Sequence, residues 1–150
     1  MAIRPFISND TKAVVQLLKN NTPKYFAPSE EKDLLHYLDS ERDDYYVIEE
    51  DGVVLGAGGI NYFPEQKRAR ISWDIVNPDV QGKGLGRKLL EFRIDRINKN
   101  PSIDVIEVRT SQIAFRFYEK HGFELKSIEK DYWAIGFDLY RMTLENKYVL

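Results

Sequence analysis

The alternation of hydrophobic and polar residues along the chain predicts helices and strands in mixed order. Residues 11–20 and 30–39 carry apolar side chains three and four positions apart, the spacing of helices with one buried face. Ser29 stands before the second helix, where a hydroxyl can cap free N–H groups. The leucines expected to point inward in that helix are Leu34, Leu35 and Leu38. Two helices are therefore predicted after a short edge strand at residues 3–6.

Segments rich in β-branched and aromatic residues predict the remaining strands. They cover residues 45–50, 53–62, 69–76, 104–110, 124–131 and 137–144. Asp51 and Gly52 join the first two as a favoured hairpin dipeptide. One further helix is expected to end near Asn98, and another to cover residues 111–121 with Gly122 as its left-handed C-cap. The order predicts an α/β (α+β) fold, with a mixed, mostly antiparallel sheet of six to seven strands flanked by about four helices on both faces.

Length and composition narrow the class of protein. The 150 residues suit a single domain spanning 1–150, and 43% hydrophobic with 31% charged residues is ordinary for a soluble globular protein. A net charge of -2 argues against a nucleic-acid partner bound by overall charge. The absence of cysteine and the presence of two histidines argue against a metal site. Because the sequence shows neither a signal peptide nor a membrane-spanning run, a cytoplasmic protein is expected.

A glycine-rich loop lies between the strand at residues 69–76 and the following helix. Gly82, Gly84 and Gly86 occupy alternate positions, so the backbone can approach a ligand closely, and the N–H groups of the helix start favour phosphate. Lys83, Arg87 and Lys88 add positive charge. The spacing does not match a Walker loop or a Rossmann fingerprint. The loop therefore predicts a diphosphate site, the alternative being an exposed turn with solvated basic residues.

Two motifs resemble the GNAT family of acyl-CoA-dependent N-acetyltransferases. Gln81-x-x-Gly84-x-Gly86 is similar to the family's Q/R-x-x-G-x-G/A signature. Residues 111–123, SQIAFRFYEKHGF, are similar to its N-x-x-A-x-x-F-Y-E-K-x-G-F element, with Ser111 in place of the commoner asparagine. Together these motifs cover the C-terminal half of the chain from about residue 70 to residue 123.

The resemblance implies that acetyl-CoA binds at a central pair of splayed strands. Main-chain groups of Asp74, Ile75 and Val76 would bond to its pantetheine arm, and the N–H of Asp74 would polarise the thioester carbonyl. Tyr118 would be the general acid that protonates the leaving thiolate. The residues expected to bind the cofactor are Asp74, Ile75, Val76, Gln81, Gly82, Lys83, Gly84, Leu85, Gly86, Arg87, Lys88, Ser111, Phe115 and Tyr118.

A general base is less clearly marked in the sequence. By the period of two, Arg70, Ser72 and Asp74 are expected on one face of their strand. The histone-modifying branch of the family tends to carry a glutamate base where Arg70 stands. Asp74 is then the nearest carboxylate, with Glu107 or a relayed water as alternatives. A salt-bridged structural role for Asp74 is equally compatible with the sequence.

Aromatic residues mark the expected acceptor end of the cleft. Tyr25, Phe26 and Trp133 are predicted to bind an amine with an apolar body, the alternative being ordinary surface aromatics. The overall prediction is an N-acetyltransferase that moves an acetyl group from acetyl-CoA directly to a primary amine of a small molecule or peptide through a ternary complex. The rival is a non-catalytic acyl-CoA-binding regulatory domain. Homodimers are common in the family, although the sequence fixes no interface.

Overall fold

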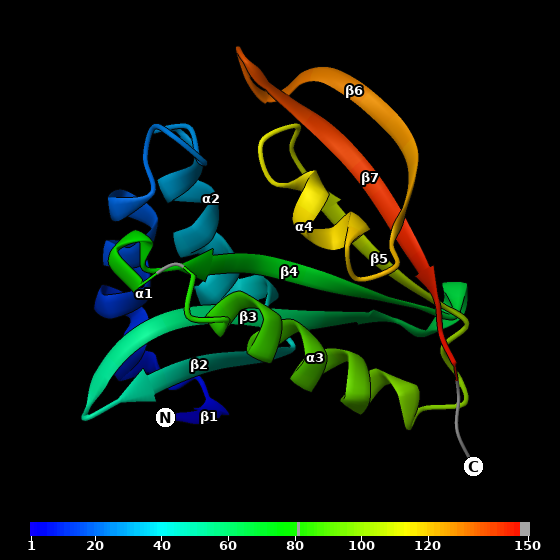
Figure 1. Cartoon of the computed structure of the whole chain (residues 1–150), viewed down its shortest axis with the longest axis horizontal. Coiled ribbons are helices and arrows are strands. Elements are labelled where there is room, and N and C mark those ends of the chain that lie inside the picture. The colour runs from blue at the N-terminus through cyan, green and yellow to red at the C-terminus, as the bar shows by residue number, and fades with distance from the viewer. Residues whose placement is uncertain (81, 148–150) are drawn as a thin grey trace.

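The computed structural model describes residues 1–80 and 82–147, which form a seven-stranded sheet with helices on both faces (Figure 1). The strands are β1 (Ala2–Pro5), β2 (Asp44–Glu50), β3 (Val53–Phe63), β4 (Arg68–Val76), β5 (Val105–Thr110), β6 (Glu124–Ala134) and β7 (Phe137–Glu145). The helices are α1 (Thr11–Asn20), α2 (Glu30–His36), α3 (Leu85–Asn98) and α4 (Phe115–Glu119). Within the described ranges, no helix is long and apolar enough to cross a membrane.

The strand order is β1-β2-β3-β4-β5-β7-β6. Only β4 and β5 are parallel neighbours among the described strands, and the other adjacent pairs are antiparallel. The predicted mixed, mostly antiparallel sheet with four helices is therefore confirmed. The hairpin between β2 and β3 also turns as predicted, because Asp51 and Gly52 both have positive φ angles of 52° and 78°.

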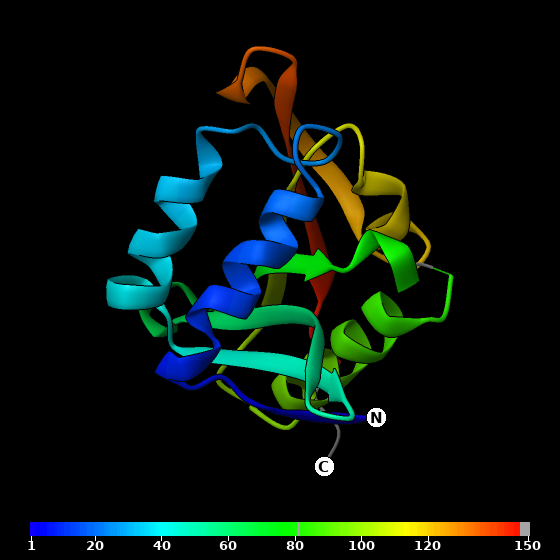
Figure 2. The same ribbon diagram turned by 90° about the vertical axis from the view of Figure 1, so that its left-hand side faces the viewer.

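Each face of the sheet has its own hydrophobic core. Helices α1 and α2 lie side by side over one face, while α3 and α4 cover the other (Figure 2). In β2, Tyr45 and Val47 join the core beneath α1 and α2, whereas Tyr46 and Ile48 join the core beneath α3. The continuous apolar run of β2 follows from burial on both of its sides.

The second predicted helix differs from the observed one in three details. Helix α2 ends at His36 and continues as a π-helical turn over Tyr37–Glu41. Leu35 is 42% exposed, so its predicted inward position is wrong, while Leu34 and Leu38 are buried. Ser29 makes no side-chain cap. Glu30 instead reaches back, and its Oε2 accepts the N–H of Ala27 at 2.7 Å, which satisfies a backbone donor next to the helix start.

The predicted helix over residues 111–121 is shorter in the structure. Residues 112–114 form a turn, and α4 covers Phe115–Glu119. The hydroxyl of Ser111 accepts the N–H of Ile113 at 3.2 Å, which favours the turn over a straight helix start. Gly122 has a φ of 93° and ends the segment as predicted.

Strand β4 contains a bulge that reverses the side-chain alternation. The register between β3 and β4 shifts between Ala57 and Gly59, so that Trp73 and Asp74 together oppose one residue of β3. Trp73 has a φ of 48°, and Asp74 consequently faces α3 and α4 while Ser72 faces the α1 and α2 side. The prediction that Arg70, Ser72 and Asp74 share a face is wrong, since a period of two holds only in an unbulged strand.

Strands β4 and β5 separate toward their C-terminal ends. They pair at four positions from Arg68↔Val105 to Ile71↔Val108, while β4 continues to Val76 and β5 to Thr110. Figure 1 shows the two strands diverging beyond this paired region. The predicted splayed pair is confirmed, and it leaves main-chain groups of β4 without a strand partner on that side.

Candidate active site

A cleft of about 970 Å³ opens where β4 and β5 separate. Most residues predicted for the site line it, although they come from both halves of the chain. These are Tyr25, Phe26, Asp74, Ile75, Val76, Gly82, Gly84, Leu85, Gly86, Arg87, Ser111, Tyr118 and Trp133. Lys83, Lys88 and Phe115 are not among the lining residues, and Gln81 lies outside the described residues. The Phe115 ring packs on Tyr140, with the two ring centroids 4.9 Å apart. Phe117, and not Phe115, lines the cleft.

One end of the cleft is formed by the glycine loop and the start of α3. Gly84 is the N-cap of this 14-residue helix, with a φ of 75°, and a Cβ added at this position would meet no atom within 4 Å. Open space therefore lies directly before the free N–H groups of the helix, which is the arrangement that favours phosphate. The Nε of Arg87 pairs with Glu91 Oε1 at 2.7 Å. The main-chain N–H groups are therefore the principal hydrogen-bond donors at this end of the cleft.

Tyr118 and Asp74 meet at the middle of the cleft. The Tyr118 hydroxyl donates to Oδ2 of Asp74 at 2.5 Å, joining α4 to the bulge of β4. Burial raises the pKa of Tyr118 well above its ordinary value, and the neighbouring Asp74 carboxylate raises that pKa further. The phenol consequently keeps its proton at neutral pH, the state that a general acid requires.

Arg93 of α3 holds the Asp74 carboxylate in place. The Arg93 side chain is fully buried, forms an ion pair with Asp74, and donates to the carbonyl oxygens of Leu89 and Gly59 at 3.0 Å each. A Cβ on Gly58 would collide with Oδ1 of Asp74 and with the Arg93 guanidinium, so any larger residue there would displace this ion pair. Sequence reasoning missed Arg93. The available signal was a charged residue four positions after Leu89 on the buried stripe of α3.

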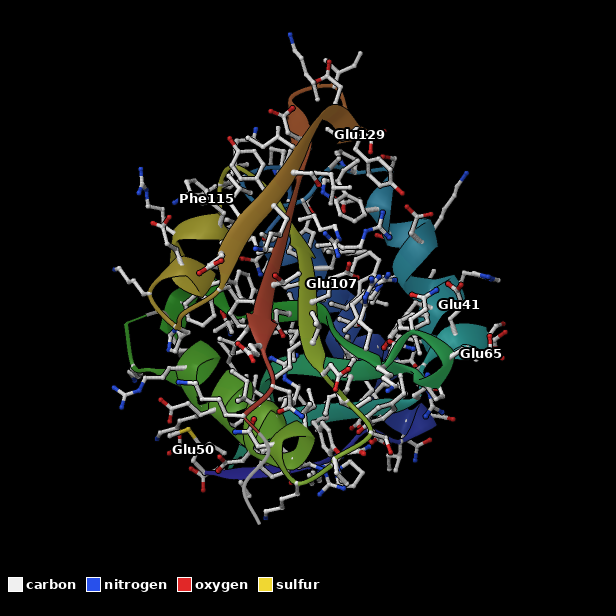
Figure 3. The ribbon with its side chains drawn as sticks, turned by 90° about the vertical axis from the view of Figure 1, so that its right-hand side faces the viewer. Glu41, Glu50, Glu65, Glu107, Phe115 and Glu129 are labelled. Carbon is white, nitrogen blue, oxygen red and sulfur yellow. The ribbon has the colours of Figure 1, made fainter. Side chains whose placement is uncertain are left out.

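Glu107 does not face the cleft as an unpaired base. Glu107 is 1% exposed. Its carboxylate accepts hydrogen bonds from Arg70 Nε at 2.7 Å, Arg141 Nε at 2.5 Å and Arg68 Nη1 at 3.4 Å. Burial alone would raise the pKa of Glu107, but the hydrogen bonds and charges of these arginines hold that pKa below its ordinary value. Figure 3 shows Glu107 in the middle of β5.

A third carboxylate, Glu30, lines the cleft from the start of α2. It is 6% exposed, and burial raises its pKa above the ordinary value. The stack of Phe26 on Trp73, with ring centroids 6.2 Å apart, holds this segment against the β4 bulge. Nothing local in the sequence marks Glu30 as a carboxylate that a distant strand buries.

The predicted acceptor-side aromatics converge from separate elements. Tyr25 and Phe26 come from the segment between α1 and α2, and Trp133 comes from β6. The indole N–H of Trp133 donates to the carbonyl oxygen of Thr110 at 3.1 Å, which fixes the ring beside the end of β5. These residues give the cleft an apolar wall away from the glycine loop.

The fold is that of the class of N-acetyltransferases that the two motifs resemble. A sequence profile of the acetyltransferase (GNAT) family matches residues 11–123, and the chain belongs to this family. An amino-acid acetyltransferase of Actinobacillus pleuropneumoniae serotype 3 is 30% identical over 109 residues, covering 68% of this chain and 24% of that protein. The chain thus spans about a quarter of the length of that relative.

Solved structures of acetyltransferases share the fold. The ribosomal-protein-S18-alanine N-acetyltransferase of Escherichia coli aligns with a TM-score of 0.80 and 21% identity, covering 99% of this chain and 96% of that one. An aminoglycoside 6'-N-acetyltransferase complexed with coenzyme A aligns with a TM-score of 0.75 and 13% identity, covering 97% of both chains. At these identities the likeness establishes the architecture.

Proposed function

We propose that the protein is an acetyl-CoA-dependent N-acetyltransferase acting on a primary amine of a small molecule or peptide. The observation that carries the proposal is the unpaired edge of β4 beyond Ile71, which runs from the open helix start at Gly84 to the buried hydroxyl of Tyr118. The edge suits an extended amide-bearing arm, and the helix start suits the diphosphate to which that arm is attached. When bound, acetyl-CoA supplies the activated acetyl thioester.

Three side chains have separate roles in proton transfer under this proposal. Tyr118 holds the proton that the departing thiolate takes up. Asp74, fixed by Arg93, orients the Tyr118 hydroxyl and is too engaged to serve as the base. Glu30 receives the proton of the incoming ammonium, directly or through a water, because burial raises its pKa toward the range useful for a base.

Transfer is direct in this scheme. Glu30 takes the first proton from the ammonium, the neutral amine nitrogen then forms a bond to the acetyl carbon, and the carbon–sulfur bond breaks. Tyr118 gives its proton to the thiolate and is reprotonated by the second proton, which the acylated nitrogen releases, so that one proton is released overall. The chain has no cysteine that could carry the acetyl group, which favours a ternary complex over a ping-pong route. The rival function, a non-catalytic acyl-CoA-binding domain, would need the same cleft but not the buried hydroxyl at its centre.

A titration and a turnover assay separate the two functions. Calorimetry with acetyl-CoA, with ATP and NAD as controls, is expected to show micromolar binding of acetyl-CoA alone. A panel of primary amines is then screened for release of free thiol. Binding without release of thiol from any amine would favour the regulatory domain, and binding of none of the three ligands would remove both functions.

A further inference from the structure

Three arginines share a single carboxylate on the face of the sheet that α1 and α2 leave partly uncovered, and a fourth arginine lies close to them. Arg68 and Arg70 of β4 and Arg141 of β7 surround Glu107, and Arg109 lies two residues further along β5. Arg109 and Arg141 are direct cross-strand partners, a like-charge pairing that is unfavourable without an anion nearby. The cluster therefore carries an excess of positive charge where β4 and β5 begin to separate.

Two of these arginines line the cleft: Arg70 and Arg109. Each is held by an aromatic ring and by one hydrogen bond. The guanidinium carbon of Arg70 lies 4.6 Å from the Phe63 ring centroid, and its Nε donates a hydrogen bond to Oε1 of Glu107. In the part of the chain that the structure describes, this is the single hydrogen bond from the Arg70 side chain. Its two Nη groups thus remain available to a ligand in the cleft.

Arg109 is held in the same way from the other strand. Its guanidinium carbon lies 5.1 Å from the Tyr132 ring centroid and 5.5 Å from that of Trp133. Its Nη2 donates to the Tyr132 hydroxyl at 2.6 Å, the one side-chain hydrogen bond of Arg109 within residues 1–80 and 82–147. An arginine that rests on aromatic rings keeps its planar fork oriented for a bidentate anion.

We propose, on the basis of the function proposed above, that the acceptor is an amine that also carries a carboxylate, which Arg70 and Arg109 bind together. A cleft lined by two fixed guanidinium groups would repel a plain diamine or polyamine. Glu30 and Glu41 also line the cleft and suit an ammonium group. The lining thus offers groups for both charges of an amino acid, with Trp133 and Phe137 available to an apolar side chain.

Matched acceptors test the carboxylate directly. Each of the standard amino acids is compared with its carboxamide, which keeps the side chain and the amine but removes the negative charge. Calorimetric binding to the coenzyme-A-saturated protein is the primary readout, because the carboxamide also lowers the pKa of the amine and so disturbs turnover. We expect at least one amino acid to bind about tenfold or more tighter than its amide.

Three variants assign the effect to its residues. Arg109→Gln and Arg70→Gln are expected to bring the acid-to-amide affinity ratio close to one. Arg141→Gln is the matched control, because it removes a charge and a Glu107 partner from the same cluster without lining the cleft. It should leave the ratio unchanged. Arg70→Lys, which preserves the charge beside Glu107, is added in case Arg70→Gln fails to fold, and should retain only part of the preference.

The outcomes separate this inference from the proposed function. Equal affinity for every acid and its amide, or a ratio that survives in both Arg70→Gln and Arg109→Gln, overturns the carboxylate site. If acetyl-CoA does not bind, the acetyltransferase function is withdrawn. The acid-to-amide affinity ratio, measured on the protein alone, then still decides whether Arg70 and Arg109 hold a carboxylate.

Discussion

The hydroxyl of Tyr118 donates to Oδ2 of Asp74 at 2.5 Å, and this contact joins helix α4 to the bulge of the central strand β4. Arg93 holds the same carboxylate from the other side. The hydroxyl is thereby fixed in position and kept protonated at the point where β4 and β5 separate.

Replacing Tyr118 by phenylalanine is expected to lower kcat by about 10²-fold or more, because the proton donor is lost while the ring is kept. The affinity for acetyl-CoA should change little. Steady-state kinetics and calorimetry measure the two effects. Tyr62→Phe is the matched control, since its hydroxyl donates to Asp44 at 2.9 Å outside the residues that line the cleft. A wild-type rate for Tyr118→Phe across the pH range would exclude the acid role.

Replacing Arg93 by methionine is expected to destabilise the protein by about 3–5 kcal/mol, because it leaves the Asp74 carboxylate without its buried partner. Urea unfolding measures the change. Arg116→Met removes an exposed ion pair with Glu119 and should shift the free energy of unfolding by no more than about 0.5 kcal/mol. Equal effects of the two substitutions would contradict a buried anchoring role for Arg93.

Replacing Gly84 by leucine is expected to abolish acetyl-CoA binding, because the side chain would fill the open space at the start of α3. Gly52→Leu is the matched control. Gly52 also has a positive φ, 78°, and an open Cβ position, but it lies in the turn between β2 and β3. Both variants carry the same backbone strain and should lose similar stability. Intact acetyl-CoA affinity in Gly84→Leu would show that the phosphates bind elsewhere.

The Glu107 cluster is expected to make folding sensitive to acid. The pKa of Glu107 in the folded protein lies below its ordinary value of 4.5. Its contribution to stability is therefore present above pH 4.5 and is lost as the pH falls through the folded pKa. Urea midpoints measured from about pH 7 to pH 3 should fall for the wild type. Glu107→Gln should be less stable at neutral pH but show a shallower decline. Identical slopes would exclude this linkage.

Glu30→Gln is expected to lower kcat/KM by about 10²- to 10⁴-fold if Glu30 accepts the amine proton. The pKa of Glu30 is raised above 4.5, so the acid limb of the pH profile should reflect a carboxyl titrating above that value in the wild type. The limb belonging to the acceptor amine should persist in the variant. Glu31→Gln, at the exposed neighbouring position, serves as the control. Unaltered kinetics of Glu30→Gln would assign the proton to water.

The sequence by itself determined the order of elements and marked the glycine loop and Tyr118 as candidate site features. These features are local. Apolar spacing predicts each helix and strand, and the three alternate glycines around the start of α3 indicate a close backbone approach wherever the segment lies. The same is true of Gly122, whose left-handed conformation follows from its place after a helical segment. Residues a few positions apart are sufficient to specify each of them.

Only the tertiary structure decided which side chains meet. The bulge at Trp73 and Asp74 depends on pairing with β3 and on the space left by Gly58, and it turns Asp74 toward Tyr118 and away from Ser72. Arg93 gains its partner only when α3 packs on the sheet. Burial of Glu30 and the sharing of Glu107 among arginines also require strands distant in sequence. Electrostatic roles depend on such neighbours, because charge and desolvation act through space and a sequence pattern records neither.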